Sequence, residues 1–149
     1  MVGVDGVLVS MRAIILLLTL VSGPSGETGF VVITSPATPM DSVTPFRLKQ
    51  IYLGRLDRLK GMHLKPLHLK SGDPTRTNFE RQILGDRADL EDYWLQQKLK
   101  AGARPPSEVS DWVLVVAYVK RNPGFVGYIP AEFAEDARKR GVKLVTVSR

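Results

Sequence analysis

Apolar positions along the chain fall into short β-branched runs separated by stretches with helical spacing. Residues Phe30 to Ile33 form a β-branched run between Gly29 and Ser35-Pro36, which predicts a buried strand. Residues 125–129 and 142–147 have the same character and predict two more strands. Because helical patterns separate these runs, we expect an α/β fold in which helices flank a mixed sheet.

Four helices are expected from capping and stop signals. Thr44-Pro45 begins the first helix and Gly54 ends it, while Asp73-Pro74 begins the second. A third helix starts at Asp86, and residues 131–140 form a fourth. The expected core residues of the first helix are Phe46, Leu48, Ile51, Tyr52 and Leu53, and those of the third are Leu90, Tyr93, Trp94 and Leu99.

Two further segments are less regular. Residues 63–69 alternate between apolar and polar, which predicts a strand near a sheet edge because Pro66 cannot donate to a ladder. Residues 112–119 are rich in valine, as strands are. Ser110 nevertheless offers a helix cap and Asn122-Pro-Gly124 a helix stop, so the pattern alone leaves strand and helix open.

The N-terminal region has the three parts of a secretory signal peptide. Met11-Arg12 precedes an apolar run at 13–21, which is too short to span a bilayer comfortably, and small turn-forming residues follow at 23–29. We therefore expect a signal peptide and linker at 1–29, a domain at 30–149, and a periplasmic protein. A buried first strand or helix is the alternative, and translation starts at Met1 or Met11.

Composition narrows the chemistry. The 149 residues fit one domain, and the lack of cysteine excludes disulfides, thiolate metal sites and a lipoprotein anchor. The net charge of +6 favours anionic partners. His63 and His68 are separated by an odd number of positions on one expected strand, which argues against a shared metal site. The sequence carries no recognisable catalytic motif, so we expect neither an enzyme nor a cofactor.

The strongest candidate site is the turn at 70–77, which opens the second helix. Free amides and the helix dipole at such a position attract an oxyanion. The turn offers hydroxyls and a guanidinium, and its candidate ligand-binding residues are Ser71, Gly72, Thr75, Arg76 and Thr77. An ordinary solvated helix cap is the alternative.

A basic stretch runs from Arg47 to Lys70, with Asp57 as its single acidic residue before the turn. It is either a docking surface for an acidic partner or a solvated face. Nucleic-acid readers interleave aromatic and basic residues, and Tyr52 is the only aromatic residue in the stretch, so we expect no nucleic acid as a partner.

Three stretches together resemble the short substrate-binding proteins of phosphate ABC transporters. They are Leu48-Lys-Gln-Ile-Tyr-Leu-Gly-Arg55, the run from Phe79 to Gly85 with Tyr93-Trp94 downstream, and Ala117-Tyr-Val-Lys-Arg-Asn-Pro-Gly-Phe-Val-Gly-Tyr128. The resemblance implies a periplasmic-binding-protein-like fold of which this chain matches one of the usual two lobes, and it implies a helix at 112–120. It also implies that a Ser-Gly-Thr phosphate motif stands near the second helix, where this chain has Pro74-Thr75-Arg76.

These observations leave two hypotheses for function. The first is an exported solute-binding-like protein that binds phosphate or a related oxyanion for ABC-type transport, with an ABC permease as partner. The second is an envelope interaction module that keeps the fold, has lost the ligand and holds an envelope protein. Neither hypothesis makes the chain an integral membrane protein, because Arg12 interrupts any longer apolar stretch.

Overall fold

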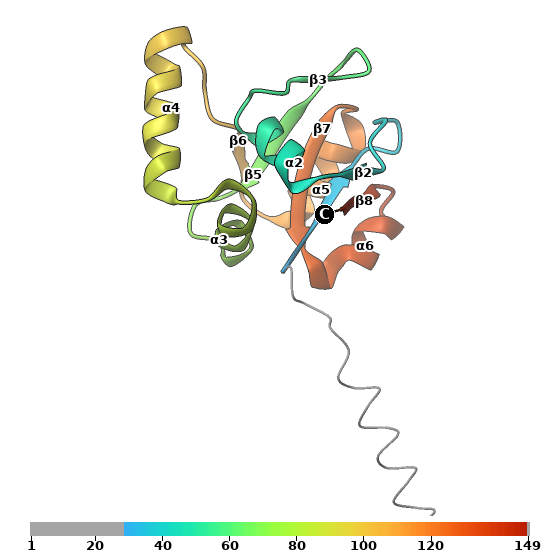
Figure 1. The fold of residues 1–149 in the computed structure, drawn as a ribbon. Helices are drawn as coiled ribbons and strands as arrows, with labels where there is room; N and C mark the ends of the chain where they lie inside the picture. Colours follow the sequence, from blue (N-terminus) through green and yellow to red (C-terminus); the bar gives the residue numbers. More distant parts are fainter. Residues whose placement is uncertain (1–28, 149) are drawn as a thin grey trace, which may run out of the picture.

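The computed structural model describes residues 29–148 and centres on a six-stranded sheet (Figure 1). The strand order is β2-β8-β1-β7-β5-β6, and a separate hairpin joins β3 to β4. The sheet strands are β1 (Phe30–Thr34), β2 (Ser42–Val43), β5 (Lys65–Leu69), β6 (Ser107–Val109), β7 (Phe125–Pro130) and β8 (Lys143–Val147), and the hairpin strands are β3 (Arg58–Leu59) and β4 (Met62–His63).

Strand directions in the sheet are mixed, as expected. β1 runs antiparallel to both β7 and β8, whereas β5 runs parallel to β6 and β7. The β1–β7 register pairs Phe30 with Pro130 and Ile33 with Gly127, which confirms that the two predicted strands share one sheet. Because β5 and β6 are parallel, they end at the same end of the sheet, and the chain continues from each of them into a helix.

Helices cover both faces of the sheet (Figure 1). On one face lie α2 and α3, the latter continuing into a π-helical turn, η1, and α5 covers the opposite face; α4 stands out beyond the sheet edge. The helices are α2 (Pro45–Tyr52), α3 (Pro74–Phe79), η1 (Glu80–Leu84), α4 (Arg87–Ala101), α5 (Trp112–Arg121), the 3-10 turn η2 (Ala131–Phe133) and α6 (Ala134–Lys139).

The valine-rich segment is helical, as the resemblance implied. Its cap is Asp111, whose carboxylate accepts from the Leu114 amide at 3.0 Å, and not the predicted Ser110. Gly127 lets α5 approach β7 closely, because a Cβ there would lie 2.5 Å from a Val115 methyl carbon. The valines of α5 thus pack on the sheet instead of extending it.

Aromatic side chains fill the core on the α2 and α3 face. Phe79 stacks on Tyr128 with ring centroids 4.0 Å apart, and the Tyr52 hydroxyl donates to the Leu67 carbonyl at 2.9 Å. His68 joins this cluster and is buried. The cluster ties β5 and β7 to both helices and fixes the position of the chain where α3 begins.

Several predictions about individual positions were wrong. Phe46 and Leu99, expected in the core, are 70% and 74% exposed. The predicted strand at 63–69 is divided between β4 and β5. Its predicted place near the sheet edge is confirmed, since only the unpredicted β6 lies outside β5. The predicted helix at 131–140 is divided between η2 and α6.

Of the predicted signal peptide and linker at 1–29, residues 1–28 lie outside the described residues. Within 29–148, no helix combines the length and the apolar character that crossing a membrane requires.

Candidate functional site

A pocket of about 440 Å³ opens beside the start of α3, between η1, α4 and β6. Among the predicted ligand-binding residues, Arg76 lines it. The pocket has a charged part and an apolar wall. Its charged side chains are Arg76, Glu80, Arg87, Glu91 and Glu108, its apolar ones are Leu84, Leu90, Trp94, Pro105 and Pro106, and His68 lies at its base.

Arg76 is held by three partners within the lobe. Its Nη1 lies 2.7 Å from Glu108 Oε2 and donates to the Leu69 carbonyl at 2.9 Å, while its Nε lies 3.4 Å from Glu80 Oε2. Its side chain is only 11% exposed, because these contacts enclose the guanidinium. Burial by itself would lower the pKa of Arg76. The hydrogen bond with Glu108 and the charge of Glu80 together outweigh burial, so the pKa is raised above its ordinary value.

Arg87 is a second cation that sequence analysis missed. It opens α4, and its Nη1 lies 2.9 Å from Glu80 Oε1 while its Nη2 donates to Ser71 Oγ at 2.8 Å. Glu80 therefore sits between two guanidiniums, and Arg87 also pairs with Glu91 at 3.5 Å. The sequence spacing of Arg76 and Arg87 does not predict that they share a pocket, because the π-helical turn between them sets their relative position.

The start of α3 is occupied by the chain's own carboxylate. Asp73 Oδ1 accepts from the Thr75 amide at 2.8 Å, as the predicted cap requires, and the Asp73 carbonyl accepts from the Thr77 hydroxyl at 3.3 Å. Thr75 is buried, whereas Ser71, Gly72 and Thr77 are exposed on the turn. The predicted residues thus cluster around the helix start without all facing one cavity.

His68 is a neutral group at the base of the pocket. Burial, with the charges of Arg76 and Arg87, lowers its pKa from 6.5 to about 3. Its Nδ1 lies 2.8 Å from the Tyr128 hydroxyl, which also accepts from the Leu69 amide at 3.3 Å. Within the described part of the chain, no three histidine, aspartate or glutamate side chains are grouped as a metal ion requires.

Comparison with solved structures identifies the fold. PstS of Borrelia burgdorferi matches 80% of this chain with a TM-score of 0.66 at 17% identity. The fold is that of one lobe of a periplasmic-binding-protein-like protein. A Clostridium perfringens protein with bound phosphate matches 80% of the chain with a TM-score of 0.60 at 22% identity. An ABC-type phosphate transport receptor of Vibrio cholerae matches 78% with a TM-score of 0.60 at 17% identity.

The lobe spans less than half of these proteins, covering 47%, 44% and 45% of their respective chains. Its sequence matches no protein-family model and no curated protein. The likeness therefore shows the fold alone. The names of two of the solved proteins describe a phosphate ABC transporter substrate-binding protein and a phosphate transport receptor.

The cations of the basic stretch at 47–70 lie on several elements of the lobe. Arg55 lies over the Tyr93 ring at 5.1 Å and Lys65 over the Phe125 ring at 5.9 Å, while Arg58 and Lys60 belong to the β3–β4 hairpin.

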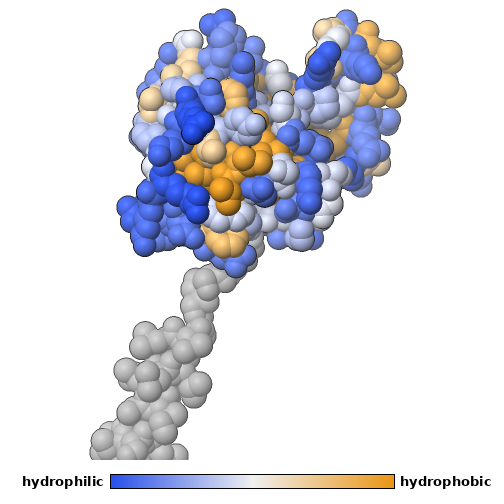
Figure 2. Space-filling view, turned by 180° about the vertical axis from the view of Figure 1, so that it is seen from behind, coloured by the Kyte–Doolittle hydropathy of each residue, from blue (hydrophilic) through white to orange (hydrophobic). Residues whose placement is uncertain are grey.

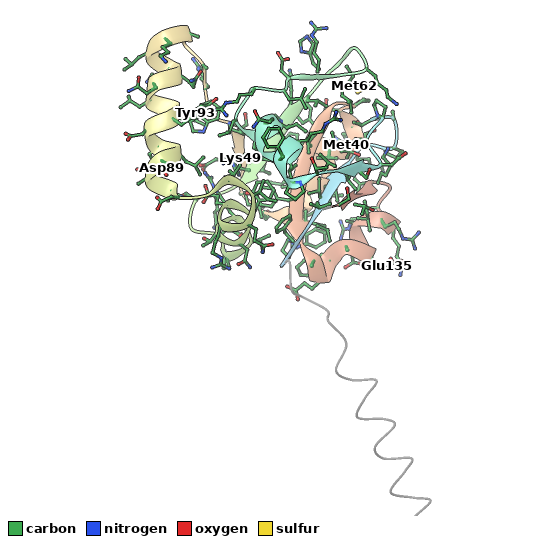
Figure 3. All side chains as sticks on the ribbon, viewed as in Figure 1. Met40, Lys49, Met62, Asp89, Tyr93 and Glu135 are labelled. Atoms are coloured by element: carbon green, nitrogen blue, oxygen red, sulfur yellow. The ribbon has the colours of Figure 1, made fainter. Side chains whose placement is uncertain are left out.

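Tyr93 connects α4 to the region of α2. In Figure 3, its side chain projects from α4 toward α2, the helix that carries Lys49. The Tyr93 hydroxyl donates to the Leu53 carbonyl at 2.6 Å and so anchors α4 beside the pocket.

Proposed function

We propose that this lobe is a solute-binding protein whose pocket beside α3 holds phosphate or a related oxyanion for ABC-type transport. The observation that carries the proposal is the convergence of Arg76 and Arg87 in one pocket at the end of a parallel strand. Open α/β sheets bind ligands at this end of their strands. One protein with the same fold was solved with bound phosphate. No catalytic step is part of the proposal.

The carboxylates of the pocket define which oxyanion it favours. Two arginines face three glutamates, so a fully ionised anion such as sulfate would meet net repulsion. A protonated phosphate can donate its O–H groups to a glutamate and accept hydrogen bonds from a guanidinium. We therefore expect selection of phosphate over sulfate, and weaker binding as rising pH removes phosphate protons.

Export is also part of the proposal. The signal peptide in the segment at 1–29 would deliver the lobe to the periplasm, where an ABC permease would receive its ligand. Because one lobe offers one wall of a cleft, an additional protein surface would have to cover the bound anion.

Calorimetric titration of the purified protein with phosphate and with sulfate tests the proposal. Arg87→Gln is the sharper variant, because the Arg87 side chain is half exposed and its loss spares the core. A charge-assisted hydrogen bond contributes about 1.5–3 kcal/mol. Phosphate affinity should therefore fall roughly tenfold to a hundredfold in Arg87→Gln.

Lys60→Gln, on the exposed hairpin, removes the same charge and should leave affinity unchanged. Equal losses in Arg87→Gln and Lys60→Gln would mean that only the overall charge matters. Arg76→Ala should weaken binding too, but it also unpairs Glu108 and removes one of the two partners of Glu80, so it should lower the free energy of unfolding by about 1–3 kcal/mol.

One observation favours an interaction module instead. The pocket's arginines are already paired with Glu80, Glu91 and Glu108, and Asp73 fills the anion position at the start of α3. A site neutralised from within needs no ligand to balance it. Absence of heat at millimolar phosphate would support this second function and overturn the first.

A further inference from the structure

Helix α5 is apolar around most of its circumference. Its inner face packs on the sheet through Val115, Val116 and Val119. Its outer face carries Val113, Leu114 and Tyr118, which are 40%, 42% and 49% exposed. A helix with apolar residues on all sides is typical of one that is covered on both sides. The outer face therefore lacks a cover in the described chain.

A hollow of about 410 Å³ lies between this helix and the end of α6. Its floor is apolar, and its rim is formed by four cations, Lys120, Arg121, Lys139 and Arg140. Both helices end in basic residues, which suits their dipoles and brings the four charges together. Within residues 29–148, none of the four forms an ion pair with a carboxylate.

Aromatic contacts fix the shape of this surface. Trp112 stacks on Phe133 with ring centroids 4.4 Å apart, and the Arg140 guanidinium lies 5.3 Å from the Trp112 ring centre. These contacts hold the end of α6 against the start of α5. Figure 2, which views the molecule from behind, shows hydrophobic residues gathered in the middle of this side with hydrophilic residues around them.

We propose that this basic apolar face, formed by α5 and the end of α6, binds the anionic headgroups of a membrane surface. The four cations take lipid phosphates, and the exposed side chains of Val113, Leu114 and Tyr118 enter the headgroup layer. Tyrosine suits this layer because its ring is apolar and its hydroxyl polar.

Two features favour lipid over an acidic protein. Half of the rim cations are lysines, a residue type that is depleted in protein–protein interfaces. Lysine and arginine side chains can also hold a headgroup with their charged end while their stems cover apolar surface. The face also lies across the sheet from the proposed solute pocket, since α5 and α3 cover opposite faces. It would hold the lobe at the membrane independently of solute binding.

Co-sedimentation of the full chain with lipid vesicles tests the proposal. Vesicles of two parts phosphatidylcholine to one part phosphatidylglycerol should bind the protein, and pure phosphatidylcholine vesicles should bind it far less. Added salt should weaken the binding, because it screens the headgroup charge. The difference between the two vesicle types reports the electrostatic part of the binding.

Matched variants locate the contact. Lys120→Gln combined with Arg121→Gln should lower the partition coefficient for anionic vesicles roughly tenfold to thirtyfold. Lys98→Gln combined with Lys100→Gln, on the exposed end of α4, removes the same charge and should change it by less than about threefold. Leu114→Asn should also weaken vesicle binding, and none of these changes should alter phosphate affinity.

Three results would overturn the proposal. Equal losses in the two double variants would mean that net charge alone attracts the vesicles. Equal binding to neutral and anionic vesicles would assign membrane binding to the N-terminal apolar run. Absence of sedimentation with either vesicle would leave an acidic protein as the occupant of the face.

Discussion

His68 illustrates how a single residue can couple this fold to pH. It is 4% exposed among aromatic rings, and its Nδ1 contacts the Tyr128 hydroxyl. Because burial and two nearby arginines lower its pKa to about 3, the folded protein keeps it neutral across the range in which an unfolded chain protonates it. Folding therefore excludes a proton at this position.

The sign of the pH effect follows directly. Below the ordinary histidine pKa of 6.5, the unfolded state binds more protons than the folded state, so stability falls as pH falls toward 3. We predict that protonation of His68 in the unfolded state makes the free energy of unfolding about 2 kcal/mol smaller at pH 5 than at pH 7. Urea denaturation at the two pH values measures it.

The two histidines of the chain provide a matched pair of variants. His68→Gln should remove most of this pH dependence, since glutamine does not titrate and keeps a polar group near Tyr128. His63→Gln, on the exposed β4, should retain it. The prediction fails if both variants lose the pH dependence to the same extent.

Among the elements, α5 has a cap that the sequence analysis placed one residue too early. Both Ser110 and Asp111 can cap a helix. The structure selects Asp111, whose extended backbone brings its carboxylate to the Leu114 amide. The helix itself begins at Trp112, as the resemblance implied.

Asp111→Ala should therefore lower the free energy of unfolding by about 1 kcal/mol, because it removes the acceptor of a helix-start amide. Ser110→Ala is the control and should change stability by less than about 0.5 kcal/mol. Denaturant titration of both variants compares them. A larger loss from Ser110→Ala would show that the capping assignment is wrong.

At the scale of the whole molecule, the fold is one lobe joined to an N-terminal segment that resembles a signal peptide. We predict that the exporting host cleaves this segment between Ser22 and Thr28. Mass spectrometry of the protein from its native host determines the mature N-terminus. A mature protein that begins at Met1 or Met11 would contradict export.

The candidate site was only partly predictable. The turn at 70–77 was located because Asp73-Pro74 is a local signal for a helix start, and that cap is present. Arg87, Glu80 and Glu108 were missed because they come from three elements, and only the π-helical turn and β6 bring them to Arg76. Distant charges that meet in space leave no spacing pattern in a sequence.

The sequence by itself determined the elements whose signals are local. β-branched runs, capping residues and stop signals placed β1, β7, β8 and the starts of α2, α3 and α4, because backbone preferences act over a few residues. The tertiary structure alone decided burial and pairing. Phe46 and Leu99 are apolar yet exposed, while Arg76 and Glu80 are charged yet enclosed, because burial depends on which elements meet and not on residue type.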